Sequence, residues 1–275
     1  MKKILFSSIL LIILFSWIAP ALAVDYQYDK IGMASASLNA INGKFLAGQS
    51  QDVVLPLASL TKLMTALVLL DLKLDFNKKV IITEKEINYV NAYIEEGDIT
   101  SKINLKAGDK VLVKDLWHAM LIASSNEAAV ALVDNSGLTR TQFIARMNSK
   151  AKIFGLKKTK FTEMSGIDPK NIGTAKEMAV IAWRAYRNLT IRRAGILDSY
   201  QFEDLKTGRV IGVYNRNTSL MAMEPLAMKV GYLTEAKNNC AIRLQSKGKD
   251  RVIVILHAIN NQRRNSEISR LLIKK

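Results

Sequence analysis

Four consecutive residues, Ser59-Leu60-Thr61-Lys62, constrain this chain more than any other feature. A largely apolar run over residues 63–72 follows them at once, which predicts a buried helix whose first turn carries the serine and the lysine. Residues three apart share one face of a helix, so the Ser59 hydroxyl and the Lys62 amine can meet there. A neutral amine in that place can accept the hydroxyl proton and leave a serine nucleophile, although a solvated first turn gives the same short pattern.

The first residues have the pattern of a secretory signal. Lys2 and Lys3 precede an apolar stretch over residues 4–19, and Ala21-Leu22-Ala23 forms a small-x-small cleavage site. We therefore expect a signal peptide over 1–23, export to the periplasm or the extracellular face of the envelope, and a mature chain from Val24. A retained membrane anchor is the alternative, but the stretch is short for a span. The remainder, 24–275, is expected to be a single domain without a C-terminal accessory domain.

The composition limits the classes of partner and ligand that the chain is expected to bind. The 275 residues carry a net charge of +16, dispersed along the chain with no basic motif interleaved with aromatic residues. Together with the export signal, this favours attraction to an anionic envelope surface over nucleic-acid binding. A single cysteine, Cys240, excludes an internal disulfide and is expected to be a small buried hydrophobe. With only two histidines besides, no metal site and no cofactor are expected, and the oligomeric state stays open.

Hydrophobic patterning predicts strands early, helices in the middle, and strands with a last helix at the end. Asn42-Gly43 is a hairpin signal within residues 33–47. A capping box is predicted at Thr174 and Glu177, and Asn265 is predicted to cap the final helix. Further helices are predicted over residues 113–122, 126–133 and 139–154, and further strands over 78–83, 200–203, 210–214, 227–229, 240–244 and 252–258. The fold class is therefore α+β, with one antiparallel sheet beside a helical lobe.

Two further triplets complete a constellation with Ser59 and Lys62. Ser124-Ser125-Asn126 lies at a predicted helix junction, and Lys229-Val230-Gly231 lies on a predicted strand. S-x-x-K, S-x-N and K-x-G in this order resemble the signature of penicillin-binding proteins and class A β-lactamases. In such a site Ser124 can relay a proton from Lys62 to a leaving amine, and Asn126 can bind the substrate backbone. Lys229 can hold a substrate carboxylate and help to keep Lys62 neutral, and Gly231 admits substrate to the strand edge.

The chain is similar to the D-alanyl-D-alanine carboxypeptidase family of low-molecular-mass penicillin-binding proteins over nearly its whole mature length. The similar stretches are residues 58–65, 124–132, 155–166, 173–181 and 229–240. The resemblance implies a transpeptidase-like fold and an acyl-enzyme on Ser59. It also implies peptidoglycan stem peptides ending in D-alanyl-D-alanine as substrates, and β-lactams as inhibitors. Leu69-Leu70-Asp71 is similar to the endopeptidase branch, but the choice between carboxypeptidase and endopeptidase stays open.

Two features complicate the third motif. The family usually has K-T-G, whereas this chain has Val230, which cannot donate the hydrogen bond that the threonine gives to a substrate carboxylate. A second triplet, Lys206-Thr207-Gly208, matches K-T-G fully but lies in a polar predicted hairpin turn. The family places an asparagine-rich segment before its motif, and residues 215–217 lie between the two triplets. We therefore assign the motif to Lys229.

Three alternatives stay open at this point. A β-lactamase needs a deacylating glutamate, but the similar segment at Glu84 precedes Ser124, and Glu163 lacks the expected neighbours, so both are interpreted as structural or solvated. A non-catalytic wall-binding homologue is favoured only by Val230. A Ser-His-Asp hydrolase would need His118 or His257, which lie in apolar segments typical of core or surface histidines.

Overall fold

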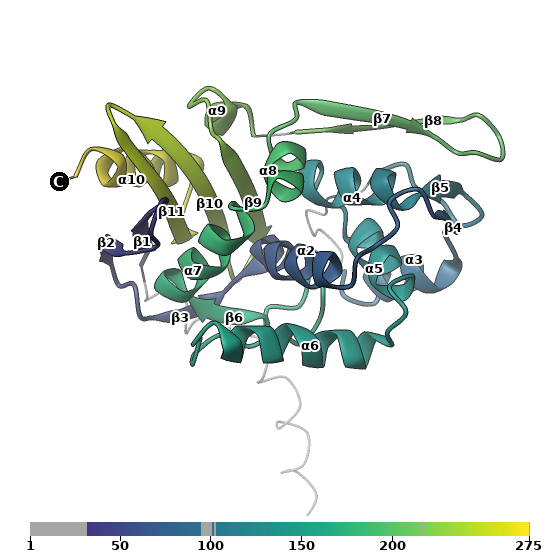
Figure 1. Cartoon of the computed structure of the whole chain (residues 1–275), viewed down its shortest axis with the longest axis horizontal. Coiled ribbons are helices and arrows are strands. Elements are labelled where there is room, and N and C mark those ends of the chain that lie inside the picture. Colours follow the sequence, from purple (N-terminus) through teal and green to yellow (C-terminus); the bar gives the residue numbers. More distant parts are fainter. Residues whose placement is uncertain (1–31, 95–100, 102, 216, 275) are drawn as a thin grey trace, which may run out of the picture. The chain divides into compact units, whose positions relative to one another are not determined.

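Strands from the two ends of the chain form one five-stranded antiparallel sheet, in the order β2-β1-β11-β10-β9 (Figure 1). Its strands are β1 (Ala34–Asn39), β2 (Phe45–Gln49), β9 (Ala227–Leu233), β10 (Lys237–Ser246) and β11 (Lys249–Ala258). The predicted N-terminal hairpin is confirmed: Gly43 turns the chain with φ of 74° and lies against the ring of Trp183. Because β9 is an edge strand, one side of it remains available to the rest of the molecule.

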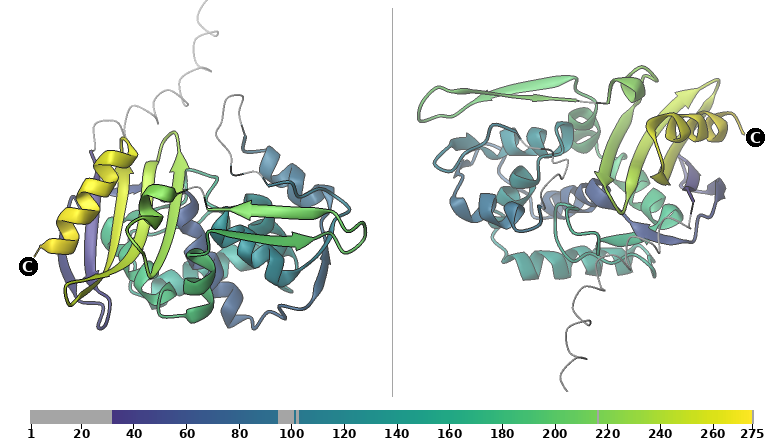
Figure 2. Two further views of the ribbon diagram at one scale, coloured as in Figure 1. Left: turned by 90° about the horizontal axis from the view of Figure 1, so that it is seen from above. Right: turned by 180° about the vertical axis from the view of Figure 1, so that it is seen from behind.

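Helices cover both faces of this sheet (Figure 2). α10 (Asn261–Ile273) covers one face, where Ile268 and Leu271 join an apolar cluster with Cys240, Ile242 and other buried residues of β10 and β11. α7 (Ala175–Ala185) packs against β1 and β11 on the other face.

The prediction that Asn265 caps the final helix is wrong. Asn260 caps it, because its side chain accepts a hydrogen bond from Arg263 N at 2.8 Å.

The predicted helical lobe is confirmed beside the sheet. Its helices are α2 (Thr61–Asp71), α3 (Glu84–Asn91), α4 (Val113–Ile122), α5 (Asn126–Asp134) and α6 (Arg140–Ile153), and a single 3-10 turn, η1 (Ala58–Leu60), leads into α2. Both α5 and α6 pack against α2, and most side chains of α2 are buried, in keeping with its apolar run. The helix that begins at the serine–lysine motif is thus the central element of the lobe.

Short strand pairs and two short helices connect the main elements; the strands predicted over residues 78–83, 200–203 and 210–214 are confirmed among them, and the other short elements were not predicted. β3 (Val54–Pro56) pairs with β6 (Ile172–Thr174), β4 (Lys79–Ile81) with β5 (Lys110–Leu112), and β7 (Ser199–Glu203) with β8 (Val210–Tyr214). The β7–β8 hairpin runs along α4 (Figures 1 and 2). Between the large elements lie α8 (Leu189–Gly195) and α9 (Thr218–Met221). The strands β3, β5 and β6 have three residues each, which is too short to give a periodic signal in the sequence.

The predicted capping box of α7 is only half formed. The Thr174 side chain accepts from Glu177 N at 3.1 Å, as predicted. The Glu177 carboxylate instead accepts from Lys157 N at 2.9 Å, from Lys158 N and from the Thr159 hydroxyl at 2.7 Å. The glutamate therefore fixes the connection that follows α6 rather than the start of its own helix.

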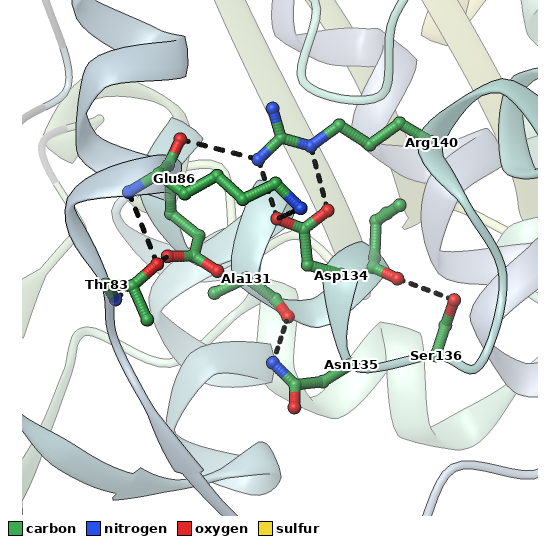
Figure 3. Close-up of polar contacts among 9 residues, drawn as sticks. Thr83, Glu86, Ala131, Asp134, Asn135, Ser136 and Arg140 are labelled. Atoms are coloured by element: carbon green, nitrogen blue, oxygen red, sulfur yellow. Dashed lines mark hydrogen bonds and ion pairs between the residues drawn. The ribbon is translucent and has the colours of Figure 1, made fainter.

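An ion pair fixes the corner of the lobe where α5 meets α6 (Figure 3). The Arg140 guanidinium donates to both carboxylate oxygens of Asp134, at 2.8 and 2.6 Å, and these hydrogen bonds raise the pKa of Arg140. Arg140 also lies over the ring of Tyr89 in α3, 4.2 Å from its centroid. Two parallel charge-assisted bonds fix the angle between the helices more firmly than one would.

The structure describes residues 32–274 except 95–100, 102 and 216, and the predicted signal peptide lies outside the described residues. Residues from Met33 onward form one compact unit. Within the described part of the chain, no helix is both long and apolar enough to cross a membrane.

Phe143 and Ile153 provide a matched test of the packing of α6. Phe143 is fully buried and Ile153 is 78% exposed on the same helix. We predict that Phe143→Ala lowers the free energy of unfolding by about 3–5 kcal/mol through the cavity that it leaves. Ile153→Ala should change it by less than about 0.5 kcal/mol. Urea denaturation of both variants measures this, and equal losses would contradict the described packing.

Candidate active site

The chain bends sharply just before the serine of the first motif. Ala58 has φ of 48°, which is uncommon for a residue with a side chain. The bend is held by Leu57 N, which donates to Asn171 O at 2.8 Å, and by the Asn239 amide, which donates to Pro56 O at 2.9 Å. Ser59 therefore lies on η1, one turn ahead of Lys62 on α2, as the motif predicts.

Lys62 is the centre of the site, because its side chain is fully buried yet makes three polar contacts. Its Nζ lies 3.0 Å from Ser59 Oγ, 2.6 Å from Asn126 Oδ1 and 2.6 Å from the Ser165 carbonyl oxygen. Asn126 Oδ1 and the carbonyl can only accept hydrogen bonds. A neutral amine has two hydrogens to donate to them, which leaves its lone pair for the Ser59 hydroxyl.

Burial controls the charge of both lysines in the site. It lowers the pKa of Lys62 to about 7, against an opposing effect of the Glu163 and Glu127 carboxylates. Burial also holds the pKa of Lys229 well below its ordinary value, and the nearby Lys62 amine lowers it further. A low dielectric environment disfavours the charged form of an amine. Lys62 can therefore act as a base near neutral pH.

The second motif divides its work between two serines at the α4–α5 junction. Ser125 caps α5 by accepting from Ala128 N at 3.1 Å. Ser124 has φ of 60°, and its hydroxyl accepts a hydrogen bond from Lys229 Nζ at 2.8 Å. Strained backbone of this kind persists only where the surroundings fix it. Ser124, the predicted relay serine, thus contacts Lys229, while Asn126, the first residue of α5, contacts Lys62.

The third motif lies on the edge strand β9, directly beside the start of α2. Lys229 is buried, and its Nζ also donates to the Val230 carbonyl at 3.0 Å. A Cβ atom on Gly231 would lie 2.7 Å from Ser59 N and 3.0 Å from Ala58 Cβ. Glycine is therefore required for β9 to approach the serine backbone. The prediction was that Gly231 gives substrate access to the strand edge, whereas in the structure it makes room for Ser59 itself.

Val230 points away from its two neighbours. Successive side chains of a strand alternate between its faces. Val230 packs against the apolar cluster under α10, together with Met221 and Met223 of the α9 region. In the described structure its side chain is part of that apolar packing, while Lys229 and Gly231 approach the serines.

A turn over residues 163–167 supplies a part of the site that sequence reasoning missed. It presents the Ser165 carbonyl to Lys62. It also places Gly166, with φ of 85°, so close to Ala58 that a Cβ atom there would overlap the Ala58 carbonyl. Glu163 is buried in this turn, which confirms that it is structural rather than solvated. A backbone carbonyl cannot be recognised from the sequence. The signal that could have indicated this turn is Gly166, which ends the similar stretch over residues 155–166.

The residues weighed as alternatives lie elsewhere. Lys206, Thr207 and Gly208 form the exposed turn of the β7–β8 hairpin, as predicted, and Thr207 N donates to the Asp204 carboxylate at 3.1 Å. His118 stacks on Tyr200, and His257 is buried in β11. Cys240 is buried, and burial raises its pKa to about 12. Among the described residues, no group of three or more His, Cys, Asp or Glu side chains is placed to hold a metal ion.

The sheet with its flanking helices and lobe, and the partly accessible Ser59 in contact with the buried Lys62, define a serine peptidase of the penicillin-binding type. The sequence matches the family described as D-alanyl-D-alanine carboxypeptidase over residues 30–260. The chain belongs to this family, and with it to the serine-type DD-peptidases.

Relatives in the family carry both carboxypeptidase and endopeptidase names. The chain is 33% identical to a D-alanyl-D-alanine endopeptidase of Pseudomonas aeruginosa over 61% of its length and 52% of that relative. It is 28% identical to the D-alanyl-D-alanine carboxypeptidase DacF of Bacillus subtilis over 99% of its length and 70% of that relative. The crystal structure of the Streptomyces K15 DD-transpeptidase superposes with a TM-score of 0.77 at 29% identity, covering 86% of this chain and 94% of that one.

The two K-x-G triplets can be separated by one pair of variants. We predict that Lys229→Ala slows covalent labelling by a fluorescent penicillin about 10- to 100-fold, the loss expected for a hydrogen bond of about 1.5–3 kcal/mol to the charged carboxylate of the penicillin. Lys206→Ala, in the exposed hairpin turn, should label at the wild-type rate. Labelling time courses decide this, and a slower Lys206→Ala variant would reverse the assignment.

Proposed function

We propose that the protein cleaves D-alanyl-D-alanine-type bonds in peptidoglycan stem peptides through an acyl-enzyme on Ser59. The contact of Ser59 Oγ with Lys62 Nζ at 3.0 Å carries this proposal, because it joins a nucleophile to a base whose pKa is near 7. The match to the D-alanyl-D-alanine carboxypeptidase family supports the substrate class, since the family acts on such peptides and binds β-lactams. No cofactor takes part in this chemistry.

The acylation step follows from the contacts. Lys62 takes the hydroxyl proton as Ser59 Oγ attacks the carbonyl carbon of the penultimate D-alanine. The resulting intermediate collapses and the C–N bond breaks. The proton that Lys62 took passes through the Ser124 hydroxyl to the leaving amine, which returns Lys62 to its neutral form. Lys229, which donates to Ser124, favours a substrate carboxylate nearby. Water then attacks the ester carbon, with Lys62 again as base, and frees Ser59.

Asn126 and the β9 edge bind the substrate in this proposal. Asn126 Oδ1 is engaged by Lys62, so its amide nitrogen is the group that faces substrate backbone. Gly231 allows β9 to lie against Ser59, which favours an extended peptide bound along the strand edge. The Val230 side chain is turned into the apolar packing under α10, contrary to its predicted place among the substrate-binding residues, so Lys229 carries the recognition of the carboxylate.

The same proposal covers the cellular setting. Residues 1–23 direct export and are removed, so that the mature chain from Val24 works in the cell envelope as one catalytic domain. The motif Ala21-Leu22-Ala23 supports the cleavage. Removal of Lys2 and Lys3 lowers the net charge from +16 to +14, which still favours the anionic envelope surface.

A digest of defined muropeptides tests the function. We predict that the protein releases D-alanine from pentapeptide monomers or splits cross-linked dimers, and that penicillin modifies a peptide containing Ser59. Mass spectrometry reads both, and Ser59→Ala should abolish both. An adduct on another serine would refute the assignment. Intact monomers and dimers together with no adduct would favour a non-catalytic wall-binding protein, and rapid turnover of penicillin itself would favour a β-lactamase.

A further inference from the structure

Glu163 is a buried carboxylate in contact with five donors. Its Oε2 accepts from Ser165 N at 2.6 Å and from the Ser165 hydroxyl at 2.6 Å. Its Oε1 accepts from Gly166 N, from Ile167 N at 3.1 Å and from the Asn171 amide at 2.5 Å. The side chain is fully shielded from solvent. Burial raises the pKa of the Glu163 carboxyl, and the hydrogen bonds from Ser165 and Gly166 oppose that rise. An ionised carboxylate is the form that accepts from all five donors, because a protonated oxygen would have to donate.

These bonds fix the turn that touches the proposed base. The Ser165 residue, bound to Glu163 through both its backbone nitrogen and its hydroxyl, presents its carbonyl oxygen 2.6 Å from Lys62 Nζ. The neighbouring Met164 carbonyl accepts from the Thr65 hydroxyl of α2 at 2.6 Å, which ties the same turn to the helix that carries Lys62. The Glu163 carboxylate therefore holds Ser165 itself, while Thr65 ties the adjoining residue of the turn to α2.

We propose that Glu163 is a positioning residue of the acylation step, which holds the 163–167 turn so that the Ser165 carbonyl orients the Lys62 amine, and which sets the charge facing that amine. The inference rests on the proposed function, since Lys62 must be the base for its orientation to matter. Glu163 acts through Ser165 and Lys62 and does not touch the reacting atoms.

The charge has a predictable sign. Lys62 is faced by Glu163 from the turn, by Glu127 from α5 and by Lys229 from β9, while Tyr89 of α3 also interacts with Glu163. The negative charge of Glu163 raises the pKa of Lys62, against the dominant effect of burial. Removing that charge lowers the pKa, so the amine becomes neutral at lower pH. The acylation rate falls at low pH as Lys62 becomes protonated. This acidic limb of the pH–rate profile must then move to lower pH.

The same contacts distinguish Glu163 from a deacylating glutamate. Both of its oxygens are engaged by protein donors, and the side chain is closed to solvent, so it has no place for a hydrolytic water. An activating carboxylate must reach the water from which it takes a proton. Glu163 instead orients the lysine.

The experiment measures acylation rate constants of the full chain with a fluorescent penicillin between pH 5 and pH 9. The variants are Glu163→Gln, Glu163→Asp and the control Glu177→Gln. Glu177 also anchors backbone nitrogens, those of Lys157 and Lys158, without contacting the 163–167 turn. Thermal unfolding verifies that each variant is folded.

We predict that Glu163→Gln moves the acidic limb down by about one pH unit, the usual scale for losing one opposite charge. Its plateau should fall about tenfold or more, since a misplaced catalytic group costs up to about 100-fold. Glu163→Asp keeps the charge but is one methylene shorter, so its limb should stay with the wild type while its plateau falls. Glu177→Gln should keep both limb and plateau.

Several results would overturn the inference. A folded Glu163→Gln variant with the wild-type limb and plateau would do so, as would an equal shift in Glu177→Gln. If Glu163→Gln does not fold, a wild-type plateau in Glu163→Asp overturns it and a lowered plateau with an unmoved limb supports it. A wild-type protein that penicillin does not acylate at Ser59 would overturn the proposed function itself, and the inference with it.

Discussion

The burial of one amine governs this structure. Lys62 is closed to solvent, and a charged amine is costly to bury without partners. Its three contacts serve both of its forms. A protonated amine donates to Ser59 Oγ, Asn126 Oδ1 and the Ser165 carbonyl, whereas a neutral one donates to the last two and accepts from the serine. A proton can therefore pass from Ser59 to Lys62 without movement of either side chain.

The fold provides these contacts by bringing three backbones unusually close together. The bend at Ala58 lies against Gly166 of the 163–167 turn on one side and Gly231 of β9 on the other. Neither glycine could carry a side chain there without displacing the serine backbone. The sheet edge and the helical lobe thus meet at Ser59, and the amine is buried because they meet so closely.

Sequence reasoning predicted the parts of the site that depend on side chains in a fixed pattern. The serine–lysine spacing placed Ser59 and Lys62 correctly at a helix start, and the S-x-N triplet lies at a helix junction as expected. The Ser165 carbonyl was beyond prediction because every residue has one. The face of Val230 depends on how β9 pairs with β10, and α10 begins after Asn260, five residues before the asparagine that was predicted to cap it. Most of the longer elements were predicted, and so was the short strand β4, but the three-residue strands β3, β5 and β6 were not.

The direct titration of Lys62 tests the account most sharply. Lysine labelled with 13C at Cε reports the protonation of each amine by NMR, and the Lys62 signal is assigned by its loss in Lys62→Arg. We predict that the Lys62 signal titrates with a midpoint of about 7, because burial lowers the pKa of the amine. A midpoint at the ordinary lysine value of 10.5 would mean that the amine stays charged at neutral pH. That result would contradict its role as the base that activates Ser59.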